Sequence, residues 1–488
     1  MTTPRDAALP EMQYLTVDGV PVFFIEADEP TVAGLIFRVG QADETAPTRG
    51  LTHLIEHLAV HAIGSVRYQH NATVDQAETT FMVRGDPSEV ASYLRSICLT
   101  LGSLPVDRSA LEARVLRTEA AGRNVGVPAA MSYLRYGYVG YGLVWLPEFF
   151  LSDPRPDALS AWATSRFNSG NCALWVVGKM PQGLTLPLPA GSAYPLPPAR
   201  EIRGLTLPAA AVGPSDTVAI DYISPRSPES TTLVRLLLDR FHRQVREAKG
   251  LTYLVAAWRQ PLSTASAENT LWLSCLESEA GQVRAEVLAI LTEMAGKGPT
   301  EQEMEEDLEA YIRSGADPDS RVSHVVGAAN YSISGMPRYT VRQFLDEQLA
   351  VTPAGCAAEL GRALQTAILS APGSVGGPPL GMNVYPITAA PVSGTAFKRQ
   401  GSKPWDKSET LVLGPEGISR VSPNGQQAVT VRWAECVGWV RDTDGTWHVL
   451  GADGFSVEFR PADWADAVTL CQWVERSISP ELRIVGLT

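Results

Sequence analysis

Gly50-Leu51-Thr52-His53-Leu54-Ile55-Glu56-His57-Leu58 is the stretch of this 488-residue chain that decides its fold. Its apolar side chains recur with the i, i+3, i+4, i+7 spacing of a helix that buries one face. These side chains are Leu51, Leu54, Ile55 and Leu58. At about 100° per residue, His53, Glu56 and His57 collect on the opposite face. Two imidazoles at i and i+4 can bind one Zn2+ while the carboxylate between them lies beside the metal, so the stretch predicts two metal ligands and a general base.

A catalytic zinc site needs a third protein ligand and keeps its fourth position for water. Pro105-Val106-Asp107 is typical of a helix start, and the helix that follows places Glu112 and Glu119 seven residues apart, on one face. We expect Glu119 to be the third ligand and Glu112 to orient a ligand from behind. His61, one turn beyond His57, is interpreted as an ordinary, partly buried histidine.

The composition is that of a soluble globular protein and excludes some partners. The net charge of -13 repels phosphate backbones, so nucleic acid is not an expected partner. No apolar run approaches the roughly 18 to 20 residues that cross a bilayer, and residues 1–20 lack the pattern of a signal peptide. The six cysteines lie far apart without a Cys-x-x-Cys pair, which indicates free thiols. We therefore expect a cytoplasmic protein that does not bind membranes.

Two proline-rich stretches, Met180–Pro214 and Ala371–Trp405, interrupt the periodic sequence and predict extended connectors. They divide the chain into three expected domains, residues 1–200, 201–395 and 406–488. The first two share an order of strands, a helix, further strands and long amphipathic helices, which indicates a duplicated α+β unit.

The third segment has a different pattern. Short strand-like runs are separated by turn signals such as Pro423-Asn424-Gly425, and one amphipathic helix follows at Ala462–Ser477. This order predicts a small antiparallel barrel or sandwich with a C-terminal helix. It resembles a bacterial pleckstrin-homology-like domain. Because its arginines are scattered among acids, we favour a packing or protein-contact role over membrane recruitment.

His53-Leu54-Ile55-Glu56-His57, preceded by Arg38–Glu44, resembles the inverted zinc signature of the pitrilysin/insulinase peptidases, which include the mitochondrial processing peptidase. Asn71-Ala72-Thr73 followed by Glu78–Phe81 resembles the family's strand that receives substrate at its edge. Glu112 and Glu119 match the family's paired-glutamate helix. In the second segment, the run from Arg246 to Tyr253 resembles the Arg and Tyr motif of the family's partner domain. The resemblance extends over about residues 12 to 390.

The resemblance implies an α+β fold in which two homologous α/β-layered peptidase domains form half of a clamshell. It implies a zinc-dependent endopeptidase with one Zn2+ per chain, held by His53, His57 and Glu119. Glu56 is then the general base. The peptide substrate is expected to add as a strand along Asn71, Ala72 and Thr73, which requires an extended or unfolded peptide.

The resemblance also assigns Tyr253 to stabilising the developing oxyanion and Arg246 to holding the substrate backbone. From the sequence alone, Tyr253 could instead be a core residue and Arg246 a solvated charge on a helix. Members of this size pair two chains to close a chamber, so we expect a homodimer, or a heterodimer with a related subunit.

One feature departs from the family pattern: His57 and Glu119 are closer in sequence than is usual. The missing residues fall between Ala62 and Arg67, where family members usually carry another helix. Two alternatives to an enzyme stay open, a non-catalytic scaffold subunit of a heterodimeric peptidase and a peptide-binding protein without turnover.

Overall fold

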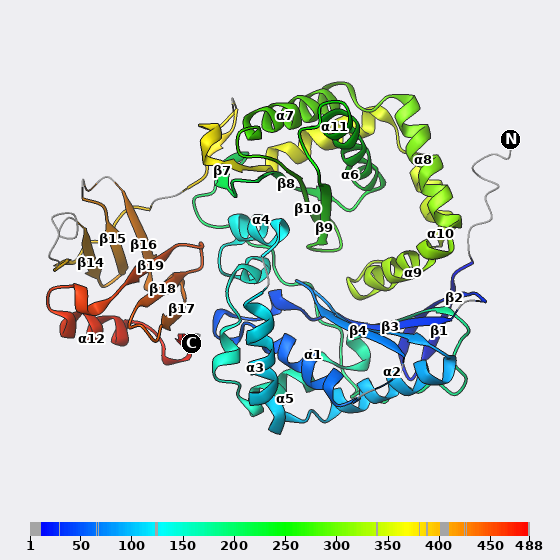
Figure 1. Cartoon of the computed structure of the whole chain (residues 1–488), viewed down its shortest axis with the longest axis horizontal. Coiled ribbons are helices and arrows are strands. Elements are labelled where there is room, and N and C mark those ends of the chain that lie inside the picture. Colours follow the sequence, from blue (N-terminus) through cyan, green and yellow to red (C-terminus); the bar gives the residue numbers. More distant parts are fainter. Residues whose placement is uncertain are drawn as a thin grey trace.

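The computed structural model describes residues 11–28, 30–64, 66, 68–122, 125–337, 340–379, 381–386, 389–400, 409–423, 425 and 427–486. Two layered α/β domains face each other, and a β-sandwich lies beside them (Figure 1). The predicted α+β fold, with two homologous layered domains forming half of a clamshell, is confirmed. Three predicted features fall partly outside the described residues: Asn424 of the turn, residues 380, 387, 388 and 401–405 of the second connector, and Ser65 and Arg67 of the shortened segment.

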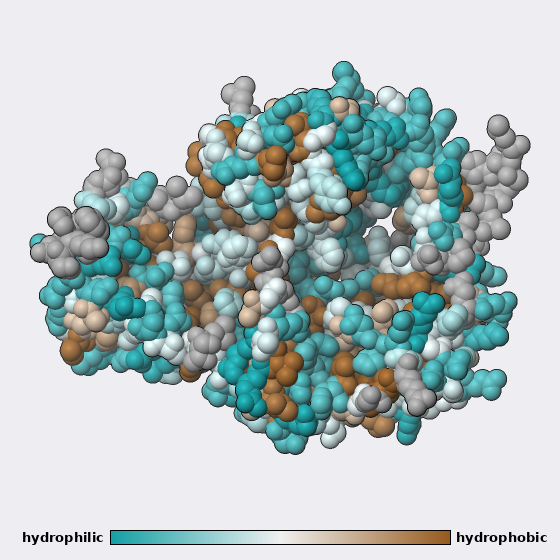
Figure 2. Space-filling view, viewed as in Figure 1, coloured by the Kyte–Doolittle hydropathy of each residue, from teal (hydrophilic) through white to brown (hydrophobic). Residues whose placement is uncertain are grey.

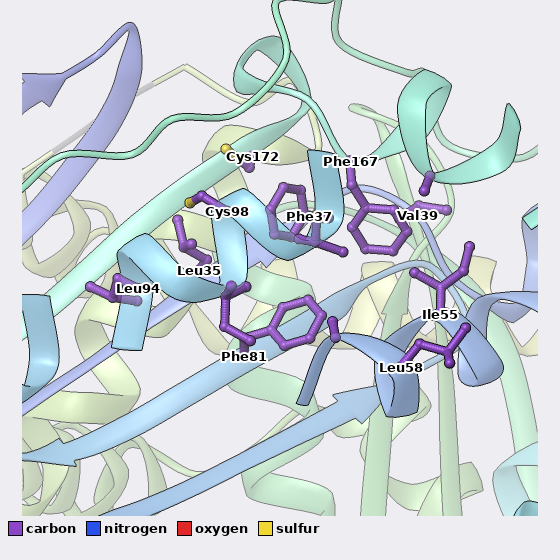
Figure 3. Packing of buried hydrophobic residues seen from close by; sticks show 14 of the residues in the cluster. Leu35, Phe37, Val39, Ile55, Leu58, Phe81, Leu94, Cys98, Phe167 and Cys172 are labelled. Carbon is purple, nitrogen blue, oxygen red and sulfur yellow. The ribbon is translucent and has the colours of Figure 1, made fainter. Parts of the chain in front are cut away.

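The first domain is built on a six-stranded sheet in the order β1-β2-β6-β3-β5-β4. Its strands are β1 (Gln13–Val17), β2 (Val20–Glu26), β3 (Thr31–Phe37), β4 (Gln69–Val74), β5 (Thr79–Gly85) and β6 (Cys172–Gly178). The pair β2 and β6 is parallel, and the other neighbours are antiparallel. One face of the sheet packs against helices α1 (Leu51–His61), α2 (Pro87–Gly102), α3 (Ser109–Ala120) and α5 (Pro156–Arg166). Figure 3 shows Phe37, Phe81 and Phe167 in the core between these layers.

The second domain repeats this plan with the strand order β12-β7-β11-β8-β10-β9. Its strands are β7 (Ala209–Gly213), β8 (Thr217–Pro225), β9 (Val255–Pro261), β10 (Ser266–Ser274), β11 (Ile368–Pro372) and β12 (Asn383–Val384). Its core packs against α6 (Pro228–Arg240), α7 (Ala280–Lys297) and α11 (Pro353–Ala363), with α8 (Glu301–Ala316) and α10 (Val341–Leu349) alongside. The parallel pair β7 and β11 occupies the place of β2 and β6, so the expected duplication is visible in the topology.

Each domain also sends one helix onto the other domain's sheet. Helix α4 (Val127–Tyr136) packs Met131 against Ala219 and Ile368 of the second sheet. Helix α9 (Pro318–Ile333) packs its buried side chains against Trp175 and neighbouring residues of the first sheet. Both faces of each sheet are therefore covered. This exchange joins the two domains through buried apolar contacts.

The sandwich pairs two four-stranded sheets. The first contains β13 (Thr395–Lys398), β14 (Thr410–Gly414), β15 (Gly417–Val421) and β16 (Ala428–Arg432). The second contains β17 (Cys436–Arg441), β18 (Trp447–Gly451), β19 (Ser456–Phe459) and β20 (Arg483–Val485). Helix α12 spans Ala467–Ser477 and begins later than Ala462, because the side chain of Asp466 accepts a hydrogen bond from Thr469 N. It does not end the domain as predicted, because β20 follows it and pairs in parallel with β17, so the sandwich is not wholly antiparallel. Strand β13 precedes residue 406, so the sandwich draws a strand from the connector.

Residues 180–208, all of them described, form neither helix nor strand, as their prolines predict. The prediction of a connector up to Pro214 is wrong, because Ala209–Gly213 form β7, which pairs with β11 in the second sheet. No helix in the described part of the chain has the length and the apolar character needed to cross a bilayer. The face shown in Figure 2 is mostly hydrophilic, with scattered apolar patches.

Candidate metal centre

Helix α1 begins at a glycine that no other residue could replace without strain. Gly50 has φ 97°, in the left-handed region, and a Cβ built on it would lie 2.6 Å from Cβ of Glu148. The buried carboxylate of Glu44 accepts hydrogen bonds from Gly50 N at 2.9 Å and Thr52 N at 2.7 Å. These bonds satisfy free N–H groups of the first turn, as a capping side chain does. The start of α1 is thus fixed in position.

The four apolar side chains of the predicted stripe pack in the core of the first domain, as their spacing predicts. His53, Glu56 and His57 therefore point away from the sheet. This second face is also covered, because His53 and Glu56 are each only 7 % exposed. A polar face that is buried needs partners, and the structure supplies them from α3 and from the segment around Glu148.

The ligand atoms of His53, His57 and Glu119 all lie within 4.8 Å of one another. Nε2 of His57 is 3.5 Å from Oε2 of Glu119. Oε2 of Glu56 lies between the rings, 3.7 Å from Nε2 of His53 and 3.9 Å from Nε2 of His57. Two helices thus place two imidazoles and a carboxylate around one point, with a second carboxylate beside it.

Glu112 lies on the same face of α3 as Glu119, but deeper. Its carboxylate is 3.9 Å from Nδ1 of His57 and 3.5 Å from Nδ1 of His61. Glu112 is buried, whereas the side chain of Glu119 is 44 % exposed. This is the position from which a carboxylate orients the far nitrogen of a ligating imidazole. His61, one turn further along α1, is exposed and not partly buried as predicted, and its Nδ1 lies near the same carboxylate of Glu112.

Glu148, which no motif in the sequence indicates, contacts the other imidazole. Oε1 of Glu148 lies 2.9 Å from Nδ1 of His53, and Arg49 approaches the same oxygen at 3.5 Å. A carboxylate on Nδ1 fixes the tautomer that leaves Nε2 free to bind a metal. The only local indication of a functional role was that Glu148 is the single acid within the apolar run 143–151.

The pKa of His57 is lowered, first by burial and then by His53, against the opposing influence of Glu119 and Glu112. A lowered pKa favours the neutral imidazole, which is the form that binds metal.

Strand β4 carries Asn71, Ala72 and Thr73 at the edge of the first sheet. Within the described residues β4 pairs with β5 alone, so its other edge is free to accept a strand. Helix α1 packs next to β4, which brings this edge close to the metal ligands.

Arg246 and Tyr253 lie in the second domain, on the segment that leads into β9, whereas the metal ligands lie on α1 and α3. The guanidinium of Arg246 is 5.5 Å from the centroid of the Tyr253 ring. Tyr253 is 83 % exposed, so it is not a core residue. The structure brings these two residues together, separately from the metal ligands.

The donor set fits a metal ion. Two imidazoles and one carboxylate are the protein ligands of known catalytic zinc sites, which leave one position open. The ligand atoms need to close by only a small amount to meet an ion at about 2.0 to 2.2 Å. Both imidazoles have a carboxylate at their far nitrogen, Glu148 for His53 and Glu112 for His57. The cluster could therefore hold a metal.

Comparison with solved structures places the fold among proteases. A protease from Helicobacter pylori aligns with a TM-score of 0.59 and 15% identity, over 74% of this chain and 99% of that one. A peptidase M16 inactive domain from Pseudomonas fluorescens aligns with a TM-score of 0.58 and 16% identity, over 76% and 99%. The periplasmic protease PqqL from Escherichia coli aligns with a TM-score of 0.57 and 12% identity, over 85% of this chain and 56% of that one.

No protein-family model and no curated protein matches the sequence. The chain is therefore similar to these proteins in fold, which is that of an M16 peptidase. One of these structures is an inactive domain, so this fold occurs both with and without catalytic activity.

Proposed function

We propose that the protein is a zinc-dependent endopeptidase that cleaves extended or unfolded peptides, with one Zn2+ held by His53, His57 and Glu119. The observation that carries this proposal is the position of Glu56. Its carboxylate lies within 4 Å of both imidazoles without being needed as a ligand. A structural metal site has no use for such a group, whereas hydrolysis requires a base beside the open position.

When bound, the metal would polarise the scissile carbonyl and lower the pKa of a water toward about 7. Glu56 takes the proton of the attacking water and returns it to the leaving amine. Burial of Glu56 and His53 keeps bulk water away from this proton transfer. Glu148 is hydrogen-bonded to Nδ1 of His53 and holds that imidazole in the orientation and tautomer that ligation requires. Glu112 lies 3.9 Å from Nδ1 of His57, where its charge favours an N–H at that nitrogen.

The free edge of β4 supports the proposed substrate class. A peptide can pair with the backbone of Asn71, Ala72 and Thr73 only if its own backbone is extended. Folded proteins have no such segment to offer. Selection by backbone pairing also predicts a broad tolerance for side chains along the substrate.

Arg246 and Tyr253 would complete the site from a second chain. Tyr253 is exposed and its ring contacts Arg246, so both are presented at the surface. In a homodimer they would face the metal centre of the partner, where Tyr253 stabilises the oxyanion and Arg246 holds the substrate backbone. A heterodimer with a related subunit would place the same groups in the same way.

A non-catalytic scaffold is the competing function, and it is favoured by the inactive domain among the structural neighbours. A scaffold has no requirement for the complete set of ligands and base that is present here. Metal analysis of the purified protein, combined with cleavage of a random peptide library before and after chelation, separates the two. Zinc-dependent cleavage supports the peptidase, whereas bound zinc without cleavage, or no zinc, overturns it. The cytoplasmic location expected from the sequence stays a prediction.

A further inference from the structure

The C-terminal sandwich is docked against the first domain and does not hang from its connector. Apolar side chains from both sides form one buried cluster, which we call the docking contact. Its members include Ala46, Leu146 and Phe149 of the first domain and Val440, Leu450 and Ile484 of the sandwich. Figure 1 shows β17 and β18 on the side of the sandwich that faces the first domain.

Two hydrogen bonds and one close backbone approach fix the register of the docking contact. Tyr138 N donates to Ala452 O at 3.3 Å, and the hydroxyl of Tyr133 donates to Gly454 O at 3.0 Å. Gly137 fits so closely that a Cβ on it would lie 2.2 Å from Ala452 O. Because only a glycine hydrogen fits between the Gly137 backbone and Ala452 O, the two surfaces cannot slide past each other here.

The same segment of the first domain carries Glu148. Leu146 and Phe149, which flank it, are buried in the docking contact. Glu148 itself points the other way, to Nδ1 of His53 at 2.9 Å. On its other side the segment touches Gly50, at the start of α1. The sandwich, Glu148 and His53 therefore form one continuous series of contacts.

We propose that the sandwich is a positioning element of the metal centre: its docking holds Glu148 against His53, and undocking weakens metal binding. This inference rests on the metal centre of the proposed function. The segment 137–149 consists of short turns and 3-10 helices and has no sheet of its own to hold it. Packing on both sides is what fixes such a segment. A shift of about 1 Å at Glu148 would release His53 from its tautomer.

Strand alternation offers a variant that undocks the sandwich without unfolding it. In β17, Trp439 faces the sandwich core, whereas Val440 faces the first domain. Val440→Asp places a charge in the docking contact and leaves the sandwich core unchanged. Ile484→Asp, on the neighbouring strand β20, disrupts the same contact if the first variant does not fold. Val468→Asp, at a site 68 % exposed on α12, is the matched control.

Zinc affinity of the full-length chain is measured by chelator competition, and docking by small-angle scattering. Val440→Asp should undock the sandwich and weaken zinc binding about 10- to 100-fold, the effect expected when a partner of a ligand is lost. Glu148→Gln should weaken zinc binding by a similar factor. The double variant should be no weaker than Glu148→Gln alone, because both changes remove the same contact. Val440→Ile and Val468→Asp should keep wild-type affinity.

An undocked Val440→Asp protein with wild-type zinc affinity would overturn the inference, as would losses that multiply in the double variant. His57→Ala is titrated in parallel. If zinc binding survives in His57→Ala, the proposed metal centre is wrong. If it is lost there but kept in the undocked variant, only the positioning role of the sandwich is wrong.

Discussion

Oε2 of Glu119 lies 3.5 Å from Nε2 of His57, although the two side chains come from different helices. Helix α1 is fixed at its start by Glu44 and Gly50, and α3 packs against α1 in the core of the first domain. The two side chains therefore meet because two independently packed helices contact each other at this point. Neither ligand depends on a mobile loop.

Removal of one ligand should abolish tight zinc binding without unfolding the protein. His57→Ala leaves two protein ligands, and its partly exposed side chain contributes little to the core. We expect about one zinc per chain in the wild type and close to none in the variant, measured by atomic emission after gel filtration. Circular dichroism should remain unchanged. Unchanged zinc in a folded His57→Ala protein would contradict the assignment.

Glu56→Gln should separate the base from the ligands. Glutamine keeps the size of the side chain but cannot accept the proton of the attacking water. We expect normal zinc content and peptide binding, with turnover reduced about 10²- to 10⁴-fold. Turnover rates of the wild type and the variant are compared at saturating peptide, and the rate of metal-free wild type is subtracted as the background. Turnover near that of the wild type would mean that the base lies elsewhere.

Gly50→Ala should damage the metal centre through the backbone. A non-glycine residue at φ 97° costs about 1–2 kcal/mol, and the new Cβ would also collide with Glu148. We expect a lower melting temperature together with weaker zinc binding. Gly64→Ala is the matched control, because Gly64 has φ 76° but no atom within 4 Å of the added Cβ. If both variants lose stability equally and neither loses zinc affinity, contact with Glu148 is unimportant.

Helix α1 and the side chains of the candidate metal centre could be predicted because the information is local. The stripe of Leu51, Leu54, Ile55 and Leu58 defines the buried face of α1, and the polar residues follow from its period. Glu112 and Glu119 are likewise related by the period of α3. The contact between α3 and α1, in contrast, was predicted from the family resemblance, because spacing alone does not indicate which helices pack together.

Glu148 could not be predicted from spacing. It is 95 residues from His53 in the sequence and lies between short 3-10 turns, where no periodicity indicates which way a side chain points. The exchange of α4 and α9 was missed for a related reason. An amphipathic pattern shows that a face is buried, but not against which sheet. Strand β13 is short and follows a Pro-rich connector, so its pairing with β14 is set by tertiary contacts.

Glu78 should make stability depend on pH. It lines a cavity of about 430 Å³ between the domains, where Asn330 of α9 donates to its carboxylate at 3.2 Å. Burial, with Asp75 nearby, raises its pKa from 4.5 to about 7. The folded state therefore binds the proton of Glu78 more tightly than the unfolded state does. The contribution of this proton to the free energy of unfolding is complete below pH 4.5 and is lost as the pH rises through 7.

Glu78→Gln should therefore be more stable than the wild type at pH 8 and similar to it at pH 4.5. Glutamine stays neutral and can still accept the hydrogen bond from Asn330. The expected difference at pH 8 is on the order of 1 to 3 kcal/mol, measured as the shift in melting temperature. Glu309→Gln, at an exposed site, should show no such difference. Equal melting temperatures of wild type and Glu78→Gln at pH 8 would show that ionisation of Glu78 does not lower the free energy of unfolding.

Two inactive variants should restore activity to each other if Arg246 and Tyr253 act on the metal centre of a partner chain. A His57→Ala chain keeps Tyr253, and a Tyr253→Phe chain keeps the metal ligands. In a mixed dimer, one of the two sites then has both. After subunit exchange at equal concentrations, half of the dimers are mixed, so we expect about a quarter of wild-type activity.

The control is a mixture of His57→Ala with Glu56→Gln. Both changes lie in the same metal centre, so each site of a mixed dimer carries one defect and no activity should return. Dimer mass is checked by light scattering in each mixture at the assay concentration. If the first mixture stays inactive while mixed dimers are present, Tyr253 does not act across a dimer. A chain that remains monomeric would instead show that this chain pairs with a different subunit or works alone.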